Sequence, residues 1–366
     1  MIGDGWDGEP SVRPGAHPDL DARRCRRVAV VTGSRADFGL LRPVMRAVQS
    51  HPELELLAMA AGAHLIQPAL TFRDVKAEFP ITDSIPMQIA GRTSRADDVQ
   101  AIASGVARLG RSFLAHQPDW VVVLGDRIEA LAGAIAGAIG GHALAHIHGG
   151  DRAEGVSDES IRHAVSKLAH LHLAATESSA ERLRRMGERP QHVLTVGSPA
   201  IDDLASFPPL PEETFVDLGA PDAVFLMHPI GRHAEEEELA AASALASLAG
   251  RRVLALWPNH DPGRAGILRA IQQSGLRSVE HLPRGRFVGL LKRVAAERGV
   301  LVGNSSAGLI EAAALGLAVV DIGERQAGRD RPGHVVHAEN ESEEAVRRAV
   351  DQALRLDRPA PDHPYG

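Results

Sequence analysis

Residues 140–163 read GGHALAHIHGGDRAEGVSDESIRH, and this stretch decides the predicted fold. Its apolar beginning, 140–147, has the pattern of a buried strand, and the part from Asp158 onward has the pattern of a helix. The loop between them carries glycines together with carboxylates and imidazoles that are able to move protons. In an open α/β sheet the ligand binds beyond the carboxyl ends of the strands, which is where this loop is predicted to lie. The alternative interpretation is a glycine turn with a charged surface.

The same succession of buried strand, polar loop and helix recurs on both sides of this stretch. Further strands are predicted at 27–32, 54–60, 118–125, 171–175, 192–196, 223–227, 253–257, 300–302 and 318–322. Helices are predicted at 40–48, 96–115, 178–186, 309–315 and 343–356. One further helix is predicted to start with the acidic residues 235–238, and another to start beyond residue 263. This order predicts an α/β protein with two Rossmann-like domains that face each other across a central cleft.

The composition of the connecting segments predicts where the domains begin and end. Residues 66–95, which include Pro68, Pro80 and Pro86, are predicted to be irregular and to serve as a mobile flap. The Pro-rich residues 206–213 are predicted to link the domains. The predicted segments are a poorly ordered extension (1–26), an N-terminal domain with acid/base residues (27–205), a C-terminal domain (214–340), and a helix with a tail (341–366).

Composition also excludes several classes of protein. The formal net charge is -7, so the chain offers no overall basic surface for nucleic acid or for an anionic membrane. No run approaches the ~18 apolar residues of a membrane helix, and residues 1–26 lack the order of a secretory signal. Cys25 is the only cysteine, which excludes internal disulfides and cysteine metal clusters. These features predict a cytoplasmic protein.

The first half carries the candidates for acid/base chemistry. Asp126 and Arg127 follow the predicted strand 118–125, where the alternative is an aspartate that caps the next helix. His148, Asp151, Asp158 and Glu159 lie in or beside the central loop. Asp158 and Arg162, like Glu159 and His163, are spaced i,i+4, which is also the spacing of ordinary surface pairs on a helix. The loop 33–39 opens a helix whose amides are expected to attract anions, and it carries Arg35.

The second half has the pattern of a site for a nucleoside diphosphate. The loop 303–308, Gly-Asn-Ser-Ser-Ala-Gly, offers backbone amides at the start of a helix, which suit phosphate oxygens. Glu311 suits the two hydroxyls of a ribose, and Arg325 supplies a fork of donors for phosphate. His228 is suited to donate to a phosphate or to protonate a leaving group. A glycine-serine helix start also occurs without any ligand.

A metal site is the alternative use of the histidines. His146 and His148 are two residues apart on a strand and so point the same way. The chain has no His-Glu-x-x-His motif and no cysteine pair, and a nucleotide site accounts for the same histidines. We therefore predict no metal.

These motifs together resemble one family, the hydrolysing UDP-N-acetylglucosamine 2-epimerases, which have the two-domain fold of the GT-B glycosyltransferases. The resemblance runs from about residue 27 to residue 336. The motifs that carry it are TGSRADFG (32–39), GDR (125–127), HIHGG (146–150), DESIRH (158–163), GSP (197–199), HP (228–229), PN (258–259), GNSS (303–306) and GER (323–325).

The resemblance implies a reaction and a set of ligands. UDP would leave by anti elimination to give a 2-acetamidoglucal, and addition of water would then release the free sugar inverted at C2. No nicotinamide, metal or other cofactor is implied, and the family suggests a homo-oligomer. The positions that match family residues for UDP are Arg35, Arg127, His228, Asn259, Ser305, Ser306, Glu311 and Arg325. Asp126 and Asp158 match two family carboxylates proposed to take part in proton transfer.

The chain departs from the family pattern at three positions. His148 stands where some members carry a glutamate proposed as catalytic, and the acid after the two glycines is the shorter Asp151. The third proton-transfer group is therefore left open between His148 and Asp151. Gly39 stands where some members have a serine, and it offers no side-chain contact.

The sequence leaves the sugar and three other functions open. The substrate is UDP-N-acetylglucosamine or a relative such as a UDP-2,4-diacetamido-trideoxy sugar, which leads to nonulosonic acids. A non-hydrolysing epimerase would return a nucleotide sugar, and a GT-B glycosyltransferase would need an acceptor. A nucleotide-sugar-binding paralogue without activity would bind UDP and form no product.

Overall fold

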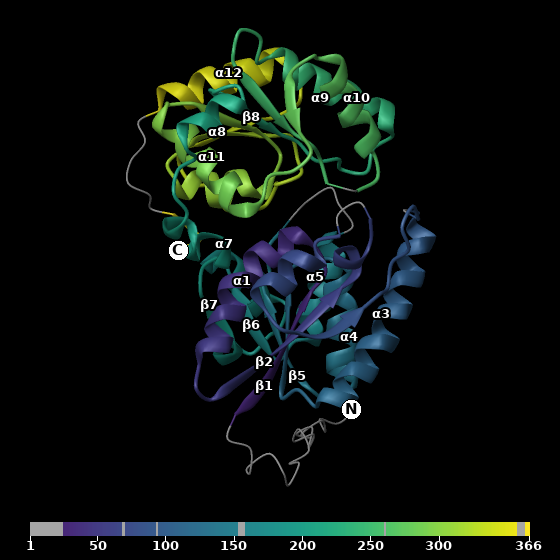
Figure 1. The fold of residues 1–366 in the computed structure, drawn as a ribbon. Helices are drawn as coiled ribbons and strands as arrows, with labels where there is room; N and C mark the ends of the chain where they lie inside the picture. Colours follow the sequence, from purple (N-terminus) through teal and green to yellow (C-terminus); the bar gives the residue numbers. More distant parts are fainter. Residues whose placement is uncertain (1–24, 68–69, 93, 153–157, 260, 357–362) are drawn as a thin grey trace, which may run out of the picture.

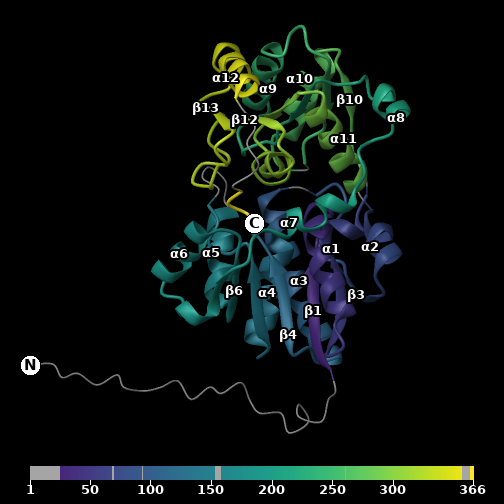
Figure 2. The same cartoon turned by 90° about the vertical axis from the view of Figure 1, so that its left-hand side faces the viewer.

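The computed structural model describes residues 25–67, 70–92, 94–152, 158–259, 261–356 and 363–366, and the two halves of the chain each form one parallel β-sheet (Figures 1 and 2). The predicted α/β class is confirmed. Of the predicted extension 1–26, all but the last two residues lie outside the described part of the structure. Within the described ranges, no helix is long and apolar enough to cross a membrane.

The first sheet has seven parallel strands in the order β3-β2-β1-β4-β5-β6-β7, which extends the Rossmann order by one strand. Its strands are β1 (Arg26–Thr32), β2 (Leu54–Ala61), β3 (Ile81–Ile85), β4 (Trp120–Leu124), β5 (Ala143–Ile147), β6 (Leu171–Ala174) and β7 (Val193–Thr195). The helices of this half are α1 (Arg35–Ser50), α2 (Phe72–Glu78), α3 (Arg95–His116), α4 (Ile128–Ile139), α5 (Asp158–Leu168), α6 (Glu177–Arg185) and α7 (Pro199–Asp202), with short 3₁₀ turns η1 (Gly62–Leu65), η2 (Pro190–His192) and η3 (Leu204–Ser206).

The second sheet has six parallel strands in the order β10-β9-β8-β11-β12-β13, which is again the Rossmann order. Its strands are β8 (Ala223–Leu226), β9 (Val253–Leu256), β10 (Arg277–Val279), β11 (Val300–Gly303), β12 (Ala318–Ile322) and β13 (Val335–Ala338). The helices are α8 (Glu212–Asp217), α9 (Ala234–Ala246), α10 (Arg264–Gln273), α11 (Arg284–Ala296) and α12 (Glu343–Arg355), with a π-helical turn η4 (Gly308–Ala312).

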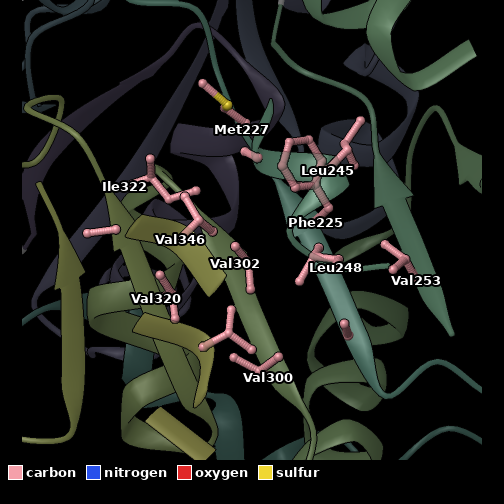
Figure 3. Packing of buried hydrophobic residues seen from close by; sticks show 14 of the residues in the cluster. Phe225, Met227, Leu245, Leu248, Val253, Val300, Val302, Val320, Ile322 and Val346 are labelled. Carbon is pink, nitrogen blue, oxygen red and sulfur yellow. The ribbon is translucent and has the colours of Figure 1, made fainter. Parts of the chain in front are cut away.

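The central strands of the second sheet are buried on both faces. Successive side chains of a strand point to opposite faces, so Phe225 of β8 packs with α9 and α12 on one face, as Figure 3 shows, while Leu226 packs with α11 on the other. In β11, Val302 likewise packs on the face of α9 and α12, and Leu301 packs on the face of α11. Burial on both faces explains why these strands read as continuous apolar runs and were predictable.

The segment 66–95 was predicted to be an irregular flap, and this prediction is wrong. It contains α2, whose Val75 is fully buried, and β3, which pairs with β2 at the edge of the sheet. Ile85 at the end of β3 is also buried. The strand lies between Pro80 and Pro86 and has a half-exposed middle, so its apolar pattern is short. Pairing with β2 determines its structure more than local pattern does.

Four further elements of the second half were not predicted, namely α8, α11, β10 and β13. The strands β10 and β13 have three and four residues and lie at the two edges of the sheet. The helix α11 follows Pro283, and no side chain caps its first turn. The predicted last helix is confirmed, with Ser342 accepting from the amide of Ala345 as its N-cap.

Residues 363–366 return to the first half rather than continuing as a free tail. Tyr365 is 1% exposed, and its backbone oxygen accepts from the amide of Ser198 over 2.8 Å. Its hydroxyl donates to the backbone oxygen of Asp330 over 2.9 Å. Both views place this end of the chain at the junction of the two halves, beside α7 (Figures 1 and 2).

The contact of α9 with α10 leads to a stability prediction. A Cβ atom at Gly266 of α10 would lie 1.8 Å from the backbone oxygen of Ala234 in α9. Because a backbone atom cannot move aside as a flexible side chain does, Gly266→Ala should lower the free energy of unfolding by about 3 kcal/mol in urea titrations. Gly110→Ala in α3 meets no atom within 4 Å and should instead add about 0.5–1 kcal/mol. Equal stabilities would contradict this account of the helix contact.

Candidate active site

Two residues predicted to be catalytic follow neighbouring strands of the first sheet. Asp126 follows β4, and His148 follows β5, which pairs with β4 in parallel register. Gly125, with φ of +73°, turns the chain at the end of β4, and its amide donates to the backbone oxygen of Ile147 over 3.0 Å. The carboxyl ends of the two strands thus bring Asp126 and His148 to the same edge of the sheet, as predicted.

Arg162, a buried residue of α5, connects the groups at this edge. Its Nη2 donates to the carboxylate of Asp126, and its Nη1 donates to the backbone oxygen of His148 over 3.2 Å. Nη1 also lies 3.8 Å from the carboxylate of Asp151. Asp158, the i,i+4 neighbour, is the first residue of α5, and its side chain lies outside the described part of the structure. Arg162 thus joins Asp126, the backbone of His148 and Asp151 at one edge of the sheet.

The imidazole of His148 is buried and bonded at both nitrogens. Nδ1 lies 2.8 Å from Asp151 Oδ2, and Nε2 lies 2.9 Å from the hydroxyl of Ser198. Asp151 also accepts from Ser179 Oγ over 2.8 Å. Burial acts to raise the pKa of Asp151, but His148, Arg329 and Ser179 outweigh it and hold this pKa below its usual value. The two candidates for the third proton-transfer group are therefore members of one hydrogen-bonded chain.

The start of α1 holds an anion of the chain itself. The carboxylate of Asp37 accepts from the amides of Gly33 and Ser34 over 2.9 and 3.0 Å, and from the hydroxyl of Thr32 over 2.7 Å. The sequence predicted that amides of the loop 33–39 attract a ligand anion. Two of them instead bind this internal carboxylate, which corrects that part of the prediction.

Arg35 and Arg127, both predicted to bind UDP, lie at the starts of α1 and α4. Burial lowers the pKa of Arg35 to about 10, although Asp74 and Glu280 act to raise it. Glu280 belongs to the second half, so Arg35 lies within electrostatic reach of that half. The Nε of Arg127 donates to Glu129 over 3.3 Å, beside Asp126.

Two predicted UDP ligands of the second half, His228 and Asn259, follow β8 and β9 and lie beside Asn304, which follows β11. The side chain of Asn304 forms two hydrogen bonds with the backbone of His228, over 2.7 and 2.8 Å. The amide of Asn259 donates to Nδ1 of His228 over 3.2 Å, so the other ring nitrogen, Nε2, carries the proton. Burial lowers the pKa of His228 to about 3, and Arg325 lowers it too. At neutral pH the residue is therefore a neutral donor.

The loop after β11 leads into the π-helical turn η4. Ser305 Oγ accepts from the amide of Ala307 over 3.4 Å, and Ser306 begins the helical segment. Arg325 donates to the backbone oxygen of Asn304 over 3.1 Å, which holds its guanidinium beside this loop. Single π turns are frequent at functional sites, because they change the side chains that a helix presents.

Glu311 lies on this π turn and is linked to the first half. It forms an ion pair with Arg284 over 2.5 Å, and Arg284 also binds Asp203 over 2.9 Å and the backbone oxygen of Ala200 over 2.6 Å. Burial raises the pKa of Glu311, although Arg284 acts to lower it. The carboxylate predicted to bind a ribose is therefore also part of a connection between the halves.

A second connection reaches the catalytic candidates. Arg329 of the second half lies 3.9 Å from the carboxylate of Asp151 and donates to the backbone oxygen of Arg152 over 3.2 Å. Ser178 of the first half donates to Asp330. The loop that carries Arg325 thus packs against the central loop of the first half. The structure brings the two predicted parts of the site to one junction.

The sequence pattern does not identify several residues at this junction. Ser198 lies within the GSP motif (197–199), and Ser179, Arg284, Arg329 and Tyr365 belong to no motif. Their partners lie in other elements, so no local pattern identifies them. Only Arg162 carried a signal, as a charged residue on a helix that follows the central loop.

His146, which the sequence offers for a metal site, has other partners. Its Nδ1 lies 3.1 Å from Ser166 Oγ, and its Nε2 lies 2.8 Å from the backbone oxygen of Gly125. Across the described ranges, no group of three or more His, Cys, Asp or Glu side chains is placed to hold a metal ion.

The burial of His146 predicts how stability depends on pH. Burial lowers its pKa from 6.5 to about 4. Between these values the unfolded chain binds a proton that the folded protein does not, so stability falls as the pH falls through this window. Replacing His146 by glutamine should make the free energy of unfolding less dependent on pH between pH 6 and 5, by up to about 1.4 kcal/mol per pH unit. The same change at the exposed His51 should leave this dependence as it is; equal slopes in all three proteins would contradict the assignment.

Known proteins of one family are similar to this chain over most of its length. The profile of the UDP-N-acetylglucosamine 2-epimerase family matches residues 46–366. The chain is 33% identical over 339 residues to the UDP-N-acetylglucosamine 2-epimerase of Neisseria meningitidis, covering 90% of this chain and 88% of that one. It is 35% identical over 326 residues to the hydrolysing UDP-N,N'-diacetylbacillosamine 2-epimerase of Legionella pneumophila, covering 85% and 84%.

Solved structures share the fold. The UDP-GlcNAc 2-epimerase of Neisseria meningitidis bound to UDP-GlcNAc aligns with a TM-score of 0.76 at 16% identity, over 93% of this chain and 96% of that one. The enzyme of Methanocaldococcus jannaschii, in complex with UDP-GlcNAc and UDP, aligns with a TM-score of 0.75 at 16% identity over the same shares. The predicted GT-B fold is confirmed. The chain belongs to the UDP-N-acetylglucosamine 2-epimerase family.

Proposed function

We propose that this protein is a hydrolysing 2-epimerase that converts a UDP-2-acetamido sugar to UDP and the free 2-epimeric sugar. The observation that carries the proposal is the junction itself. The hydrogen-bonded group of Asp126, Arg162, His148 and Asp151 lies at the carboxyl ends of β4 and β5. The loop of Arg325, which belongs to the predicted nucleotide site, packs against it through Arg329.

The two halves divide the chemistry. UDP is held in the second half by His228, Asn259, Ser305, Ser306, Glu311 and Arg325, with Arg35 and Arg127 from the first half. A base takes the proton from C2 of the sugar, the C1–O bond breaks, and UDP leaves with the bonding pair. Water then adds to the 2-acetamidoglucal, placing hydroxyl on C1 and a proton on the opposite face of C2. Asp126, Asp158 and the pair His148–Asp151 are the groups that transfer these protons.

Hydrolysis is supported by the relatives. The Legionella pneumophila protein, 35% identical, and a Campylobacter jejuni protein, 27% identical over 86% of this chain, are both named as hydrolysing diacetylbacillosamine 2-epimerases. The Neisseria meningitidis relative is named for UDP-N-acetylglucosamine. We propose that the substrate is one of these two classes of UDP sugar, both of which carry an acetamido group on C2, the carbon that is inverted.

Proton NMR in heavy water tests the reaction. The enzyme is incubated first with UDP-N-acetylglucosamine and then with a UDP-2,4-diacetamido-trideoxy sugar. Free manno-type sugar deuterated at C2, with release of UDP, is the expected result. A nucleotide sugar as product would identify a non-hydrolysing epimerase. Binding of UDP with no product from either substrate would identify an inactive paralogue.

Arg325→Ala tests the nucleotide site separately. Its guanidinium is expected to bind a phosphate of UDP, and hydrogen bonds to a charged group contribute about 1.5–3 kcal/mol. The Kd for UDP, measured by calorimetry, should therefore rise about 10- to 100-fold. Arg331→Ala removes a nearby arginine that binds Asp321 over 2.9 Å and should leave this Kd unchanged. Equal affinities of the Arg325→Ala variant and the unmodified protein would remove Arg325 from the site.

A further inference from the structure

Ser198 links the catalytic candidates to a distant part of the chain. It lies after β7, and its hydroxyl lies 2.9 Å from Nε2 of His148. On the other side of the imidazole, Nδ1 lies 2.8 Å from the carboxylate of Asp151. All three side chains are buried, with Ser198 and Asp151 each 2% exposed. The three residues form a chain of two hydrogen bonds that fixes the ring at both ends.

The chemistry of the partners determines the direction of both bonds. An ionised carboxylate only accepts, so Nδ1 of His148 donates to Asp151. In the neutral ring Nε2 is then an acceptor, and Ser198 donates its hydroxyl proton to it. When the ring is protonated, Nε2 donates instead, and the same hydroxyl oxygen accepts. A hydroxyl is the side chain that serves both charge states without movement of heavy atoms.

Ser198 itself is held firmly. Its amide donates to the backbone oxygen of Tyr365 over 2.8 Å, and its hydroxyl caps α7 by accepting from the amide of Ala200 over 3.3 Å. The preceding Gly197 has φ of +77°, and a Cβ there would lie 2.6 Å from the same oxygen of Tyr365. The buried Tyr365 therefore holds the backbone of Ser198 in place through its own backbone oxygen.

We propose that Ser198 is a positioning residue of the epimerase reaction, which holds His148 in one orientation through both charge states of its ring and so acts through His148. This inference rests on the proposed function, because it assigns His148 the proton transfer and Asp151 the orientation of the ring.

A second serine–histidine pair in the same half provides the contrast. Ser166 Oγ lies 3.1 Å from His146 Nδ1, and both side chains are fully buried. Nε2 of His146, however, bonds the uncharged backbone oxygen of Gly125 in place of a carboxylate. Burial lowers the pKa of this ring to about 4, so the ring stays neutral near neutral pH and its role is structural. Ser166→Ala is the matched control for a change at Ser198.

The test compares Ser198→Thr and Ser198→Val, which have nearly the same shape, together with Ser198→Ala and Ser166→Ala. Steady-state kinetics are measured on the full chain with the UDP sugar that the unmodified protein converts. Thr, which keeps the hydroxyl, should retain kcat within about five-fold. Val and Ala should lower kcat about 10- to 100-fold with KM changed less than about three-fold, as expected for lost orientation of an acid/base group. Ser166→Ala should keep kcat within about two-fold and lose only stability.

The pH profile separates positioning from a merely structural role. The charged and titratable groups that face His148 and its partner Asp151 are His146, Arg162, Arg182, Arg329 and Tyr365. All of these remain in the variants. Because a hydrogen bond to a charged ring is the stronger one, its loss in Val or Ala should move the acidic limb of kcat to lower pH by about half a unit or more. In ¹⁵N spectra, the resonance of His148 Nε2 is assigned by its absence from the spectrum of the His148→Gln variant. This resonance should shift in the Ser198→Ala and Ser198→Val variants. It should remain in place in the Ser198→Thr and Ser166→Ala variants.

Two different results would overturn the inference. Thr and Val variants with equal kcat and the same acidic limb, in an active enzyme, would show that the hydroxyl has no role while leaving the proposed function intact. An unmodified protein that turns over neither UDP sugar would instead overturn the proposed function, and the kinetic role of Ser198 with it. If Ala fails to fold, the Thr and Val pair still decides.

Discussion

Replacement of Asp126 by asparagine is expected to lower kcat about 10³-fold or more, while the Kd for UDP changes less than about three-fold. The carboxylate lies at the carboxyl end of β4 and is bound by Arg162. A carboxamide has nearly the same shape and still accepts from Arg162, but it cannot take up a proton at neutral pH. The loss should therefore fall on the chemical step, since the nucleotide ligands belong mainly to the second half.

Asp119→Asn is the matched control for this change. Asp119 precedes the same strand at its opposite end, where its carboxylate accepts from the amide of Arg27 over 2.7 Å. Its loss should cost some stability and leave kcat within about two-fold. Product formation is followed by NMR, and UDP binding by calorimetry, on both variants. Undiminished turnover by the Asp126→Asn variant would remove Asp126 from the mechanism.

The sequence predicted those strands and helices whose own residues carry a clear apolar pattern, whatever elements they pack against. Residues 120–124 read Trp-Val-Val-Val-Leu, and the three valines are buried in β4, so the apolar run itself identifies the strand. The short edge strand β10 has only three residues, and its position depends on pairing with β9. A periodic pattern needs several residues, and an edge strand of this length offers too few.

The residues of the site also differ in whether the sequence could predict them. Asp126 and His148 were predictable because the ends of parallel strands converge at one edge of a sheet. The contact of Ser198 with Tyr365, and that of Glu311 with Arg284, join residues from different elements. Periodicity reports which face of an element is buried, but not which loop will meet which. Such contacts follow only from the assembled fold.

The amides after β1 show why a motif can be right in place and wrong in detail. A glycine loop at a helix start does attract an anion there, but the anion is Asp37, four residues further along. Ser34 and Asp37 form a capping box at the start of α1, which accounts for this loop without a ligand. The amides of Gly33 and Ser34 are occupied by Asp37, so the loop contributes the side chain of Arg35 to the junction.

Asp151→Asn is expected to lower kcat about 10²- to 10⁴-fold, the second large effect. An ionised Asp151 accepts from His148 Nδ1 over 2.8 Å and from Ser179 over 2.8 Å. An asparagine that keeps its oxygen toward Ser179 turns its NH₂ group toward Nδ1, so the ring must carry its proton on Nε2 instead. Exchange of a carboxylate for a carboxamide behind a catalytic histidine in serine proteases costs about 10⁴ for this reason. The variant would hold His148 in the same place but in the wrong tautomer.

The change of tautomer of His148 in the Asp151→Asn variant distinguishes an Asp151 that orients the ring from an Asp151 that transfers protons itself. In the orienting case the ¹⁵N spectrum of His148 shows the proton moved from Nδ1 to Nε2, and His148→Gln loses as much kcat as Asp151→Asn. The double variant His148→Gln/Asp151→Asn should then lose little more kcat than either single variant, because both changes disable the same His148–Asp151 pair. Asp321→Asn, a change at another buried carboxylate that pairs with an arginine over 2.9 Å, should lower stability and leave kcat within about two-fold. A double variant far slower than either single variant would assign Asp151 a proton transfer of its own.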